Sequence, residues 1–195
     1  METAKRSKKE LFVLFIDFSK AFDSISRSLL WEKLSRLEIP QSLLHAIALL
    51  YQNVRVKISK TDPGVESTLG VIQGCPLSPT LFGLVLDDLF WQDTKDDRGV
   101  KLGDAVVRML LFADDVVFVS NSAERLRSQI EQLEHFCSWS QMNVNLLKTK
   151  WLRVGRGSPV DFYFQEKRIS ECYYITAIDE ARKATLEELT SRAED

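Results

Sequence analysis

Two adjacent acids, Asp114 and Asp115, interrupt an apolar run in the segment LLFADDVVFVS, residues 110–120. A buried carboxylate without a partner is costly, and two neighbouring carboxylates also repel each other. One interpretation is a two-residue hairpin turn whose tip reaches water. The other is a divalent cation held by the two side chains. The local pattern allows both, so the rest of the chain must decide between them.

A third acid, Asp17, directly follows the apolar run Leu11–Ile16. Taken alone, an acid at a strand end is more often a helix cap or a turn residue. Together with Asp114 and Asp115, it could complete a set of three carboxylates on adjacent central strands. Such a set can hold two Mg²⁺ ions about 3.5–4 Å apart for in-line phosphoryl transfer, and substrate phosphates supply part of the coordination. The hypothesis requires Asp17 and Asp114 to come within reach of one metal ion.

Apolar periodicity predicts the elements that would position these acids. A buried strand ends at Asp17, and a long amphipathic helix follows Ser122 as its N-cap. The other predicted helices are residues 26–37, 40–53 and 80–91, and the other predicted strands are residues 54–59, 65–71, 99–103, 105–113, 116–120, 144–155, 160–165 and 168–176. Short turns join many of the strands, which predicts an α+β fold with helices packed on one face of a sheet.

The composition is that of an ordinary globular domain, with 45% apolar residues, 28% charged residues and a net charge of −2. The chain as a whole therefore lacks the basic signature of nucleic-acid binding, although a groove can be locally basic. The three cysteines show neither zinc spacing nor a disulfide framework, which is typical of a reducing compartment. No apolar run approaches the roughly 20 residues of a membrane span. We expect an intracellular protein, in the nucleus or cytoplasm and not secreted, with a basic tail at residues 1–10, a folded domain at 11–178 and a charged segment at 179–195.

Four segments stand in the order of the palm motifs of reverse transcriptases. They are FIDFSKAFDSI (residues 15–25), GVIQGCPLSPTLFGLVLDDL (70–89), GVKLGDAVVRMLLFADDVVFVS (99–120) and NVNLLKTK (143–150). The chain resembles the non-LTR (LINE-type) retrotransposon branch of that family over roughly residues 11–175. The resemblance implies the palm of a right-hand polymerase, with a central antiparallel sheet and helices across one face. It also implies RNA-directed DNA synthesis, with an RNA template, a DNA primer and deoxynucleoside triphosphates as partners and substrates.

The resemblance also implies a metal site. Asp17, Asp114 and Asp115 would be the catalytic acids and the ligands of two Mg²⁺ ions, with Mn²⁺ as an alternative metal. The Phe18 carbonyl would lie beside them.

Four further residues fall at positions where the family binds substrate. Phe22 would exclude a 2′-hydroxyl from the sugar site, Gln73 and Gly74 would contact the incoming nucleotide and the template, and Lys148 would lie near the departing pyrophosphate. Their residue types alone also allow plainer roles: a core aromatic for Phe22, an ordinary turn for Gln73 and Gly74, and a solvated surface lysine for Lys148.

Residues 141–160 form a locally basic stretch without an acid. Its charged residues are Lys148, Lys150, Arg153 and Arg156, with Trp151 among them. We expect this stretch to contact phosphates, the alternative being a solvated basic edge strand.

The chain departs from the family pattern at Ile72, where many relatives have arginine, at Phe112, where tyrosine is more common, and at Gln141, where glycine is usual. Few residues precede Asp17 and no thumb segment follows the last strands, so we expect fingers and thumb to be largely absent. Such a chain would be a truncated piece of a retrotransposon protein with little activity alone, completed by missing parts or a partner chain. The alternatives are a non-catalytic remnant that binds nucleic acid or a partner, and another palm-shaped nucleotidyl enzyme such as a cyclase, which residues 73–79 and the FADD segment disfavour.

Overall fold

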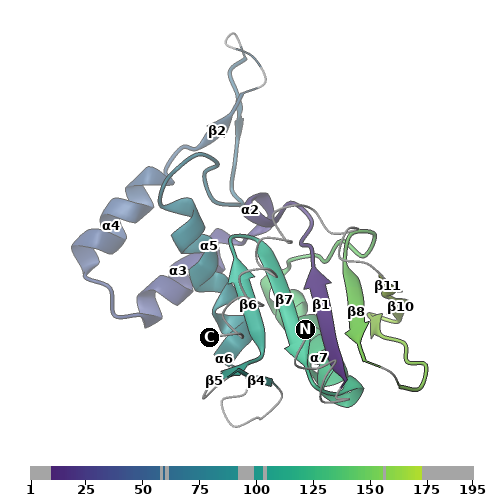
Figure 1. Ribbon diagram of the computed structural model, residues 1–195. Helices are drawn as coiled ribbons and strands as arrows, with labels where there is room; N and C mark the ends of the chain where they lie inside the picture. The colour runs from purple at the N-terminus through teal and green to yellow at the C-terminus, as the bar shows by residue number, and fades with distance from the viewer. Residues whose placement is uncertain are drawn as a thin grey trace.

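The strand that precedes Asp17 is the central strand of a five-stranded sheet (Figure 1). The computed structural model describes residues 10–57, 59, 62–91, 99–102, 105–155 and 157–172. The strands are β1 (Leu11–Ile16), β2 (Arg55–Val56), β3 (Val65–Glu66), β4 (Val100–Leu102), β5 (Ala105–Val107), β6 (Met109–Phe112), β7 (Asp115–Ser120), β8 (Lys150–Val154), β9 (Tyr163–Phe164), β10 (Lys167–Arg168) and β11 (Ser170–Glu171). The helices are α2 (Ala21–Ser24), α3 (Arg27–Arg36), α4 (Gln41–Leu50), α5 (Ser78–Leu86), α6 (Asp88–Trp91) and α7 (Ala123–Ser140).

The sheet has the strand order β11-β8-β1-β7-β6. β1 pairs antiparallel with β7 and with β8, and β6 pairs antiparallel with β7. The expected antiparallel sheet is wrong at one edge, because β11 runs parallel to β8. The chain between these two strands, which includes the β9–β10 hairpin, returns to the starting end of β8, so Ser170 pairs with Lys150.

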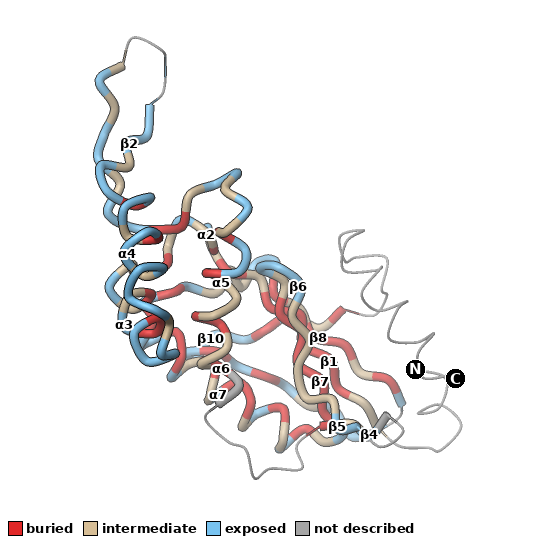
Figure 2. Tube along the Cα trace, turned by 90° about the vertical axis from the view of Figure 1, so that its left-hand side faces the viewer, coloured by how far each residue is buried: buried red, intermediate tan, exposed pale blue. Residues whose placement is uncertain are grey.

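Alternate residues of β1 enter two different buried clusters, as the two-residue period of a strand requires. Phe12, Leu14 and Ile16 join the larger cluster, which includes residues of all the longer helices. Val13 and Phe15 join a smaller cluster on the opposite face. Burial on both faces explains the unbroken apolar run of this strand. Figure 2 shows the buried residues concentrated along the sheet strands.

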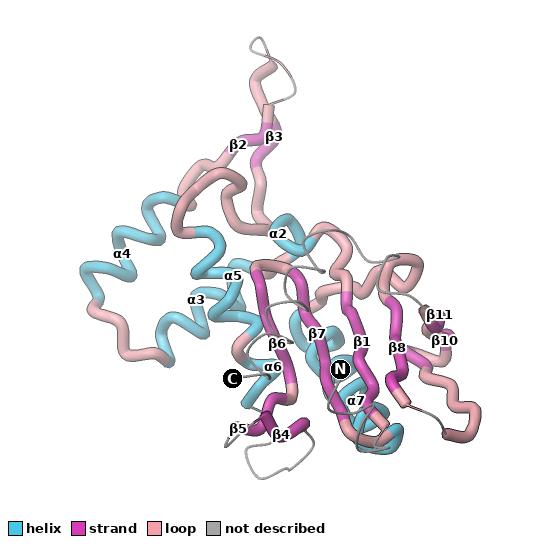
Figure 3. Tube along the Cα trace, in the orientation of Figure 1, coloured by secondary structure: helices cyan, strands magenta, loops and turns pink. Residues whose placement is uncertain are grey.

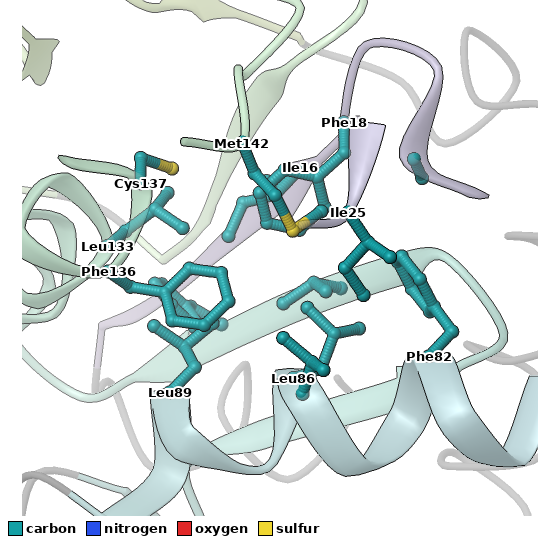
Figure 4. Packing of buried hydrophobic residues seen from close by; sticks show 14 of the residues in the cluster. Ile16, Phe18, Ile25, Phe82, Leu86, Leu89, Leu133, Phe136, Cys137 and Met142 are labelled. Atoms are coloured by element: carbon teal, nitrogen blue, oxygen red, sulfur yellow. The ribbon is translucent and has the colours of Figure 1, made fainter. Parts of the chain in front are cut away.

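The helices α5, α6 and α7 cover one face of the sheet, as expected (Figures 1 and 3). Figure 4 shows Leu86 of α5, Leu89 of α6 and Phe136 of α7 converging on Ile16 and Phe18 from the end of β1. Full burial of one such side chain contributes about 1.5–3 kcal/mol. This shared core therefore fixes the end of β1, and with it Asp17, relative to the helices.

The helices α3 and α4 and the β2–β3 hairpin lie beside the sheet, and the hairpin projects away from it (Figure 1). Lys33 of α3 is buried and forms ion pairs with Asp88 (2.5 Å) and Asp87 (3.4 Å). This charged contact joins α3 to the junction of α5 and α6, where one continuous helix was expected. The helix instead breaks at Asp87.

Several predicted boundaries need correction. Among the described residues of the predicted strands 54–59 and 65–71, only Arg55–Val56 and Val65–Glu66 form strands, because the projecting hairpin pairs with itself and not with the sheet. The strand predicted from residue 144 begins only at Lys150, because a turn occupies residues 145–149. The predicted tail and the charged C-terminal segment lie outside the described residues, apart from Glu10. No described helix is long and apolar enough to cross a membrane.

Candidate functional site

Asp17 directly follows β1 and Asp115 begins β7, and the end of β1 pairs with the start of β7, so both acids lie at the same end of the sheet (Figure 1). Ile16 pairs with Val116, and the next position of this antiparallel register aligns Asp17 with Asp115. Residues directly opposite in such a pair have Cβ atoms about 4.5–5.5 Å apart. Because side chains alternate along a strand, both carboxylates fall on the face of Phe15, away from the helices.

Asp114 lies at the tip of the β6–β7 hairpin. Phe112 pairs with Asp115, so Ala113 and Asp114 form a two-residue turn, and Asp114 is exposed. Ala113 has a φ of +53°, in the left-handed region that costs a non-glycine residue about 1 kcal/mol. The predicted hairpin is confirmed, with Ala113 and Asp114 as its turn, and the exposed Asp114 carboxylate avoids the cost of burial. Phe112, beside the turn, is also exposed (66%).

The turn that follows α7 fixes the backbone of Asp17. The amide N–H of Asp17 donates to the Thr149 hydroxyl (3.1 Å), and its carbonyl accepts from the Asn145 amide (2.7 Å). Phe18 forms an isolated bridge with Val144, and the Phe18 side chain is buried. Sequence reasoning missed Thr149 and Asn145, although both lie in the NVNLLKTK segment, where short polar residues flank the lysine.

The candidate lysine, Lys148, lies in this same turn and is exposed. Its amide donates to the Asn145 carbonyl (3.1 Å). A second lysine, Lys150, pairs directly with Phe15 in β1 and is half-buried. Lys150 is therefore on the face that carries Asp17 and Asp115. Its partner Phe15 precedes Asp17 by two positions, so Lys150 lies diagonally across from Asp17. In the sequence, Lys150 is recognisable only as one charge of the basic stretch at residues 141–160.

Asp17 and Asp115 suit an oxygen-binding divalent cation such as Mg²⁺, which takes few carboxylates and completes its shell with water and substrate phosphates. Among the residues that the structure describes, no group of three or more His, Cys, Asp or Glu side chains is placed to hold a metal ion. The structure thus brings Asp17 and Asp115 together without adding Asp114 as a third protein ligand. The shared reach of Asp17 and Asp114 to one metal stays a prediction.

A second group of candidate residues meets where α2 contacts the loop before α5. The Phe22 carbonyl accepts from the Val71 amide (2.8 Å), and Asp23 Oδ1 accepts from Gln73 Nε2 (2.7 Å). The half-buried Phe22 ring stacks on Phe82, with ring centroids 4.7 Å apart. Gln73 and its neighbour Gly74 are exposed. The structure therefore places Phe22 and Gln73 in one unit, although about 50 positions separate them in the chain.

Arg27 holds this loop from the start of α3. Its guanidinium donates to the carbonyls of Ser67, Leu69 (3.1 Å) and Gly70 (2.9 Å), and lies over the Tyr51 ring (5.2 Å). Burial lowers the pKa of Arg27 from its usual value, and the nearby Tyr51 opposes this shift. Arg27 could not be found from the sequence, because nothing in a helical segment shows that one of its residues reaches a distant loop.

The expected phosphate-contacting stretch needs correction. Trp151 is buried, and its indole N–H donates to the Ile169 carbonyl (3.2 Å), so it is a core residue. Arg153 pairs with Glu10 (3.4 Å) and donates to the Ser158 carbonyl (2.7 Å). The strand that carries them lies between β1 and β11 and is not an edge. Arg156 lies outside the described residues.

Solved structures with a similar fold include telomerases. Telomerase from Candida tropicalis in complex with the TWJ fragment of telomeric RNA superposes with a TM-score of 0.58, at 14% identity, over 84% of this chain and 30% of that chain. The apo telomerase of the same organism gives a TM-score of 0.52 at 16% identity, over 84% of this chain and 35% of that chain.

The chain belongs to the reverse transcriptase (RNA-dependent DNA polymerase) family, whose model matches residues 1–179. It is 30% identical over 137 residues to the retrovirus-related Pol polyprotein from type-1 retrotransposable element R2 of Nasonia vitripennis, covering 69% of this chain. It is 28% identical over 155 residues to the corresponding polyprotein of type-2 retrotransposable element R2DM of Drosophila melanogaster, covering 77% of this chain. The chain spans only 13% and 14% of these polyproteins. The predicted resemblance to non-LTR retrotransposon reverse transcriptases is confirmed.

Proposed function

We propose that this domain catalyses RNA-directed DNA synthesis, the transfer of a deoxynucleotide from its triphosphate to the 3′-hydroxyl of a primer. The observation that carries the proposal is the alignment of Asp17 with Asp115, one position beyond the Ile16–Val116 pair at the end of the sheet, in a chain of the reverse transcriptase family. The two acids are half-buried at the end of the sheet, where a metal ion would complete its shell with water and substrate phosphates.

Asp17 and Asp115 would hold Mg²⁺, or Mn²⁺ in its place, together with the Phe18 carbonyl and Asp114 from the hairpin turn. The chemistry that the bound metal supplies is a lowered pKa of the attacking hydroxyl and stabilisation of charge on the leaving oxygens. The chain's own contribution is positioning: the Thr149 and Asn145 hydrogen bonds fix the Asp17 backbone, and rigid placement of reacting groups supplies much of the rate.

Phe22, Gln73 and Gly74 would form the nucleotide side of this site. The Phe22 ring, held by its stack on Phe82, would exclude a 2′-hydroxyl. The exposed Gln73 amide would contact the incoming nucleotide. The exposed Lys148 would lie near the departing pyrophosphate, with Lys150 as a second cation on the face of the acids.

Primer extension with an RNA template, a DNA primer and dNTPs tests the proposal. Because we expect little activity from this chain alone, we expect weak Mg²⁺-dependent extension that EDTA stops. Asp17→Asn and Asp115→Asn should each lower the rate by at least about 10²-fold, because each removes several kcal/mol of metal-based charge stabilisation. Glu131→Gln, on the exposed side of α7, is the matched control and should keep the wild-type rate. Equal rates for all four proteins would contradict the assignment.

A second candidate function is non-catalytic binding of nucleic acid or of a partner. It is favoured by the absence, among the described residues, of three acidic, His or Cys side chains grouped for a metal. Binding of primer–template without extension in either Mg²⁺ or Mn²⁺ would support this second function.

A further inference from the structure

The exposed Asp23 makes a contact that the proposed function does not yet use. Its Oδ1 accepts a hydrogen bond from Gln73 Nε2 at 2.7 Å. An ionised carboxylate only accepts hydrogen bonds, so the amide nitrogen of Gln73 must face Asp23. The amide oxygen of Gln73 is thereby directed away from Asp23.

The backbone around this contact is fixed on both sides. The Val71 amide donates to the Phe22 carbonyl and the Gly70 amide donates to the Ile25 carbonyl, both at 2.8 Å. On the α2 side, the amide of Asp23 donates to the Lys20 carbonyl (2.9 Å). The side-chain contact therefore joins two rigid backbones, which lowers the entropy cost of holding the Gln73 side chain in one orientation.

We propose that Asp23 is a positioning residue, which orients the Gln73 amide oxygen as a hydrogen-bond acceptor for the incoming deoxynucleoside triphosphate beside Phe22. The inference rests on the proposed function, because it takes Gln73 to contact the nucleotide. Asp23 itself touches Gln73 and not the substrate. Because Phe22 and Asp23 are adjacent, the candidate sugar gate and the Gln73 amide are held at a fixed separation.

A swap of donor and acceptor tests the contact. Asp23→Ala removes the acceptor, Asp23→Asn replaces the carboxylate with an amide, and Gln73→Glu opposes two carboxylates. The double variant Asp23→Asn/Gln73→Glu restores one hydrogen bond with its direction reversed, from the new amide to the new carboxylate. Glu131→Gln serves as the remote control for loss of one negative charge.

Two measurements are made on these proteins. The first is the free energy of unfolding in urea, which can be measured without enzyme activity. We expect the effects of the substitutions at Asp23 and Gln73 on it to be non-additive, because the two side chains are in contact. The second is equilibrium binding of a fluorescent dNTP in the presence of Mg²⁺ and primer–template. Loss of a hydrogen bond to a charged acceptor, discounted because the contact is exposed, corresponds to a change of about three- to tenfold in the dissociation constant. We expect Asp23→Ala to weaken dNTP binding by that factor, and Glu131→Gln to leave it unchanged.

The double variant should recover the unfolding equilibrium but not dNTP binding, because the carboxylate introduced by Gln73→Glu carries a negative charge toward the triphosphate. If the changes in unfolding free energy from the substitutions at Asp23 and Gln73 are additive, the proposed contact between the two side chains is overturned. Coupled unfolding with dNTP binding unaffected by Asp23→Ala would overturn the positioning role. If the wild type binds dNTP but does not extend the primer, the proposed function is refuted. The positioning role of Asp23 would then still be tested by the effect of Asp23→Ala on dNTP binding. No dNTP binding by the wild type would overturn both.

Discussion

We expect substitution of Gly70 to destabilise the protein more than substitution of Gly74, the other glycine in the loop before α5. Its φ is +77°, and a Cβ built on it would lie 2.7 Å from the Phe22 carbonyl oxygen and 2.8 Å from the Asp23 Cα. These are backbone atoms, which cannot rotate away as the end of a side chain can. Gly74 is a matched control, because its φ is +81° and a Cβ there meets no atom within 4 Å.

The two substitutions share the cost of placing alanine in the left-handed region, about 1 kcal/mol. Both also share the gain from a less flexible unfolded chain. Gly70→Ala alone adds overpacking against α2, about 1–3 kcal/mol. We therefore expect Gly74→Ala to cost up to about 1 kcal/mol, and Gly70→Ala to cost about 1–3 kcal/mol more.

Urea unfolding followed by tryptophan fluorescence measures both values. For a domain of this size, 1 kcal/mol corresponds to about 2–4 °C in Tm, so Gly70→Ala should melt at least a few degrees below Gly74→Ala. Equal loss of stability in the two variants would show that the close approach of Gly70 to α2 contributes nothing, and would refute the reasoning.

Three further predictions concern single side chains. Phe22→Val should raise ribonucleotide incorporation at least about tenfold by opening space for a 2′-hydroxyl, whereas unchanged discrimination with full activity would make Phe22 a core residue only. Lys33→Met should cost about 3 kcal/mol of unfolding free energy because it leaves the partly buried Asp88 without its cation; adding Asp88→Asn should recover part of that loss, and no recovery would contradict this cause. Burial, followed by the charge of nearby Glu134, raises the pKa of the Cys137 thiol from 9.0 to about 12. The folded state thus holds the thiol proton more tightly than the unfolded state, so stability from this group is full below pH 9 and falls as pH rises toward 12; Cys137→Ala should flatten that fall, and an identical pH profile would refute it.

Elements with a strong pattern were predictable from sequence. Every residue of Leu11–Ile16 is apolar because both sheet faces are buried, and the strand formed as predicted. Ser122 accepts from the Arg125 amide (3.3 Å) as the predicted N-cap of α7. Here the local chemistry and the tertiary structure favour the same conformation.

The edges of elements were not predictable, because other contacts decided them. The NVNLLKTK segment has the composition of a strand continuing into β8. Its Asn145 and Thr149 instead use their polar groups in a turn and on the Asp17 amide. Short polar side chains compete with sheet pairing in this way, and the sequence does not show which partner wins.

Gln141 shows how the structure explains a departure from a family pattern. It stands where glycine is usual, and the structure places it at the C-cap of α7 with a φ of +60°. Glycine is preferred there because it adopts the left-handed conformation without strain. The departure therefore concerns helix termination at a cost of about 1 kcal/mol, and it carries no information about the chemistry of the site.

The Asp17–Asp115 site could be predicted from the sequence more fully than the Asp23–Gln73 contact. Asp17 and Asp115 could be brought together by hypothesis, because each borders an apolar strand and adjacent strands place their ends side by side. Asp23 gave no such signal, since an acid near a helix start is ordinary. Its hydrogen-bond partner, Gln73, can be identified only from the structure, in which Gly70 lies against the α2 backbone and the Gln73 side chain reaches Asp23. The residues proposed to bind metal are thus found from strand ends, whereas the residues proposed to orient the substrate contacts depend on how the loops pack.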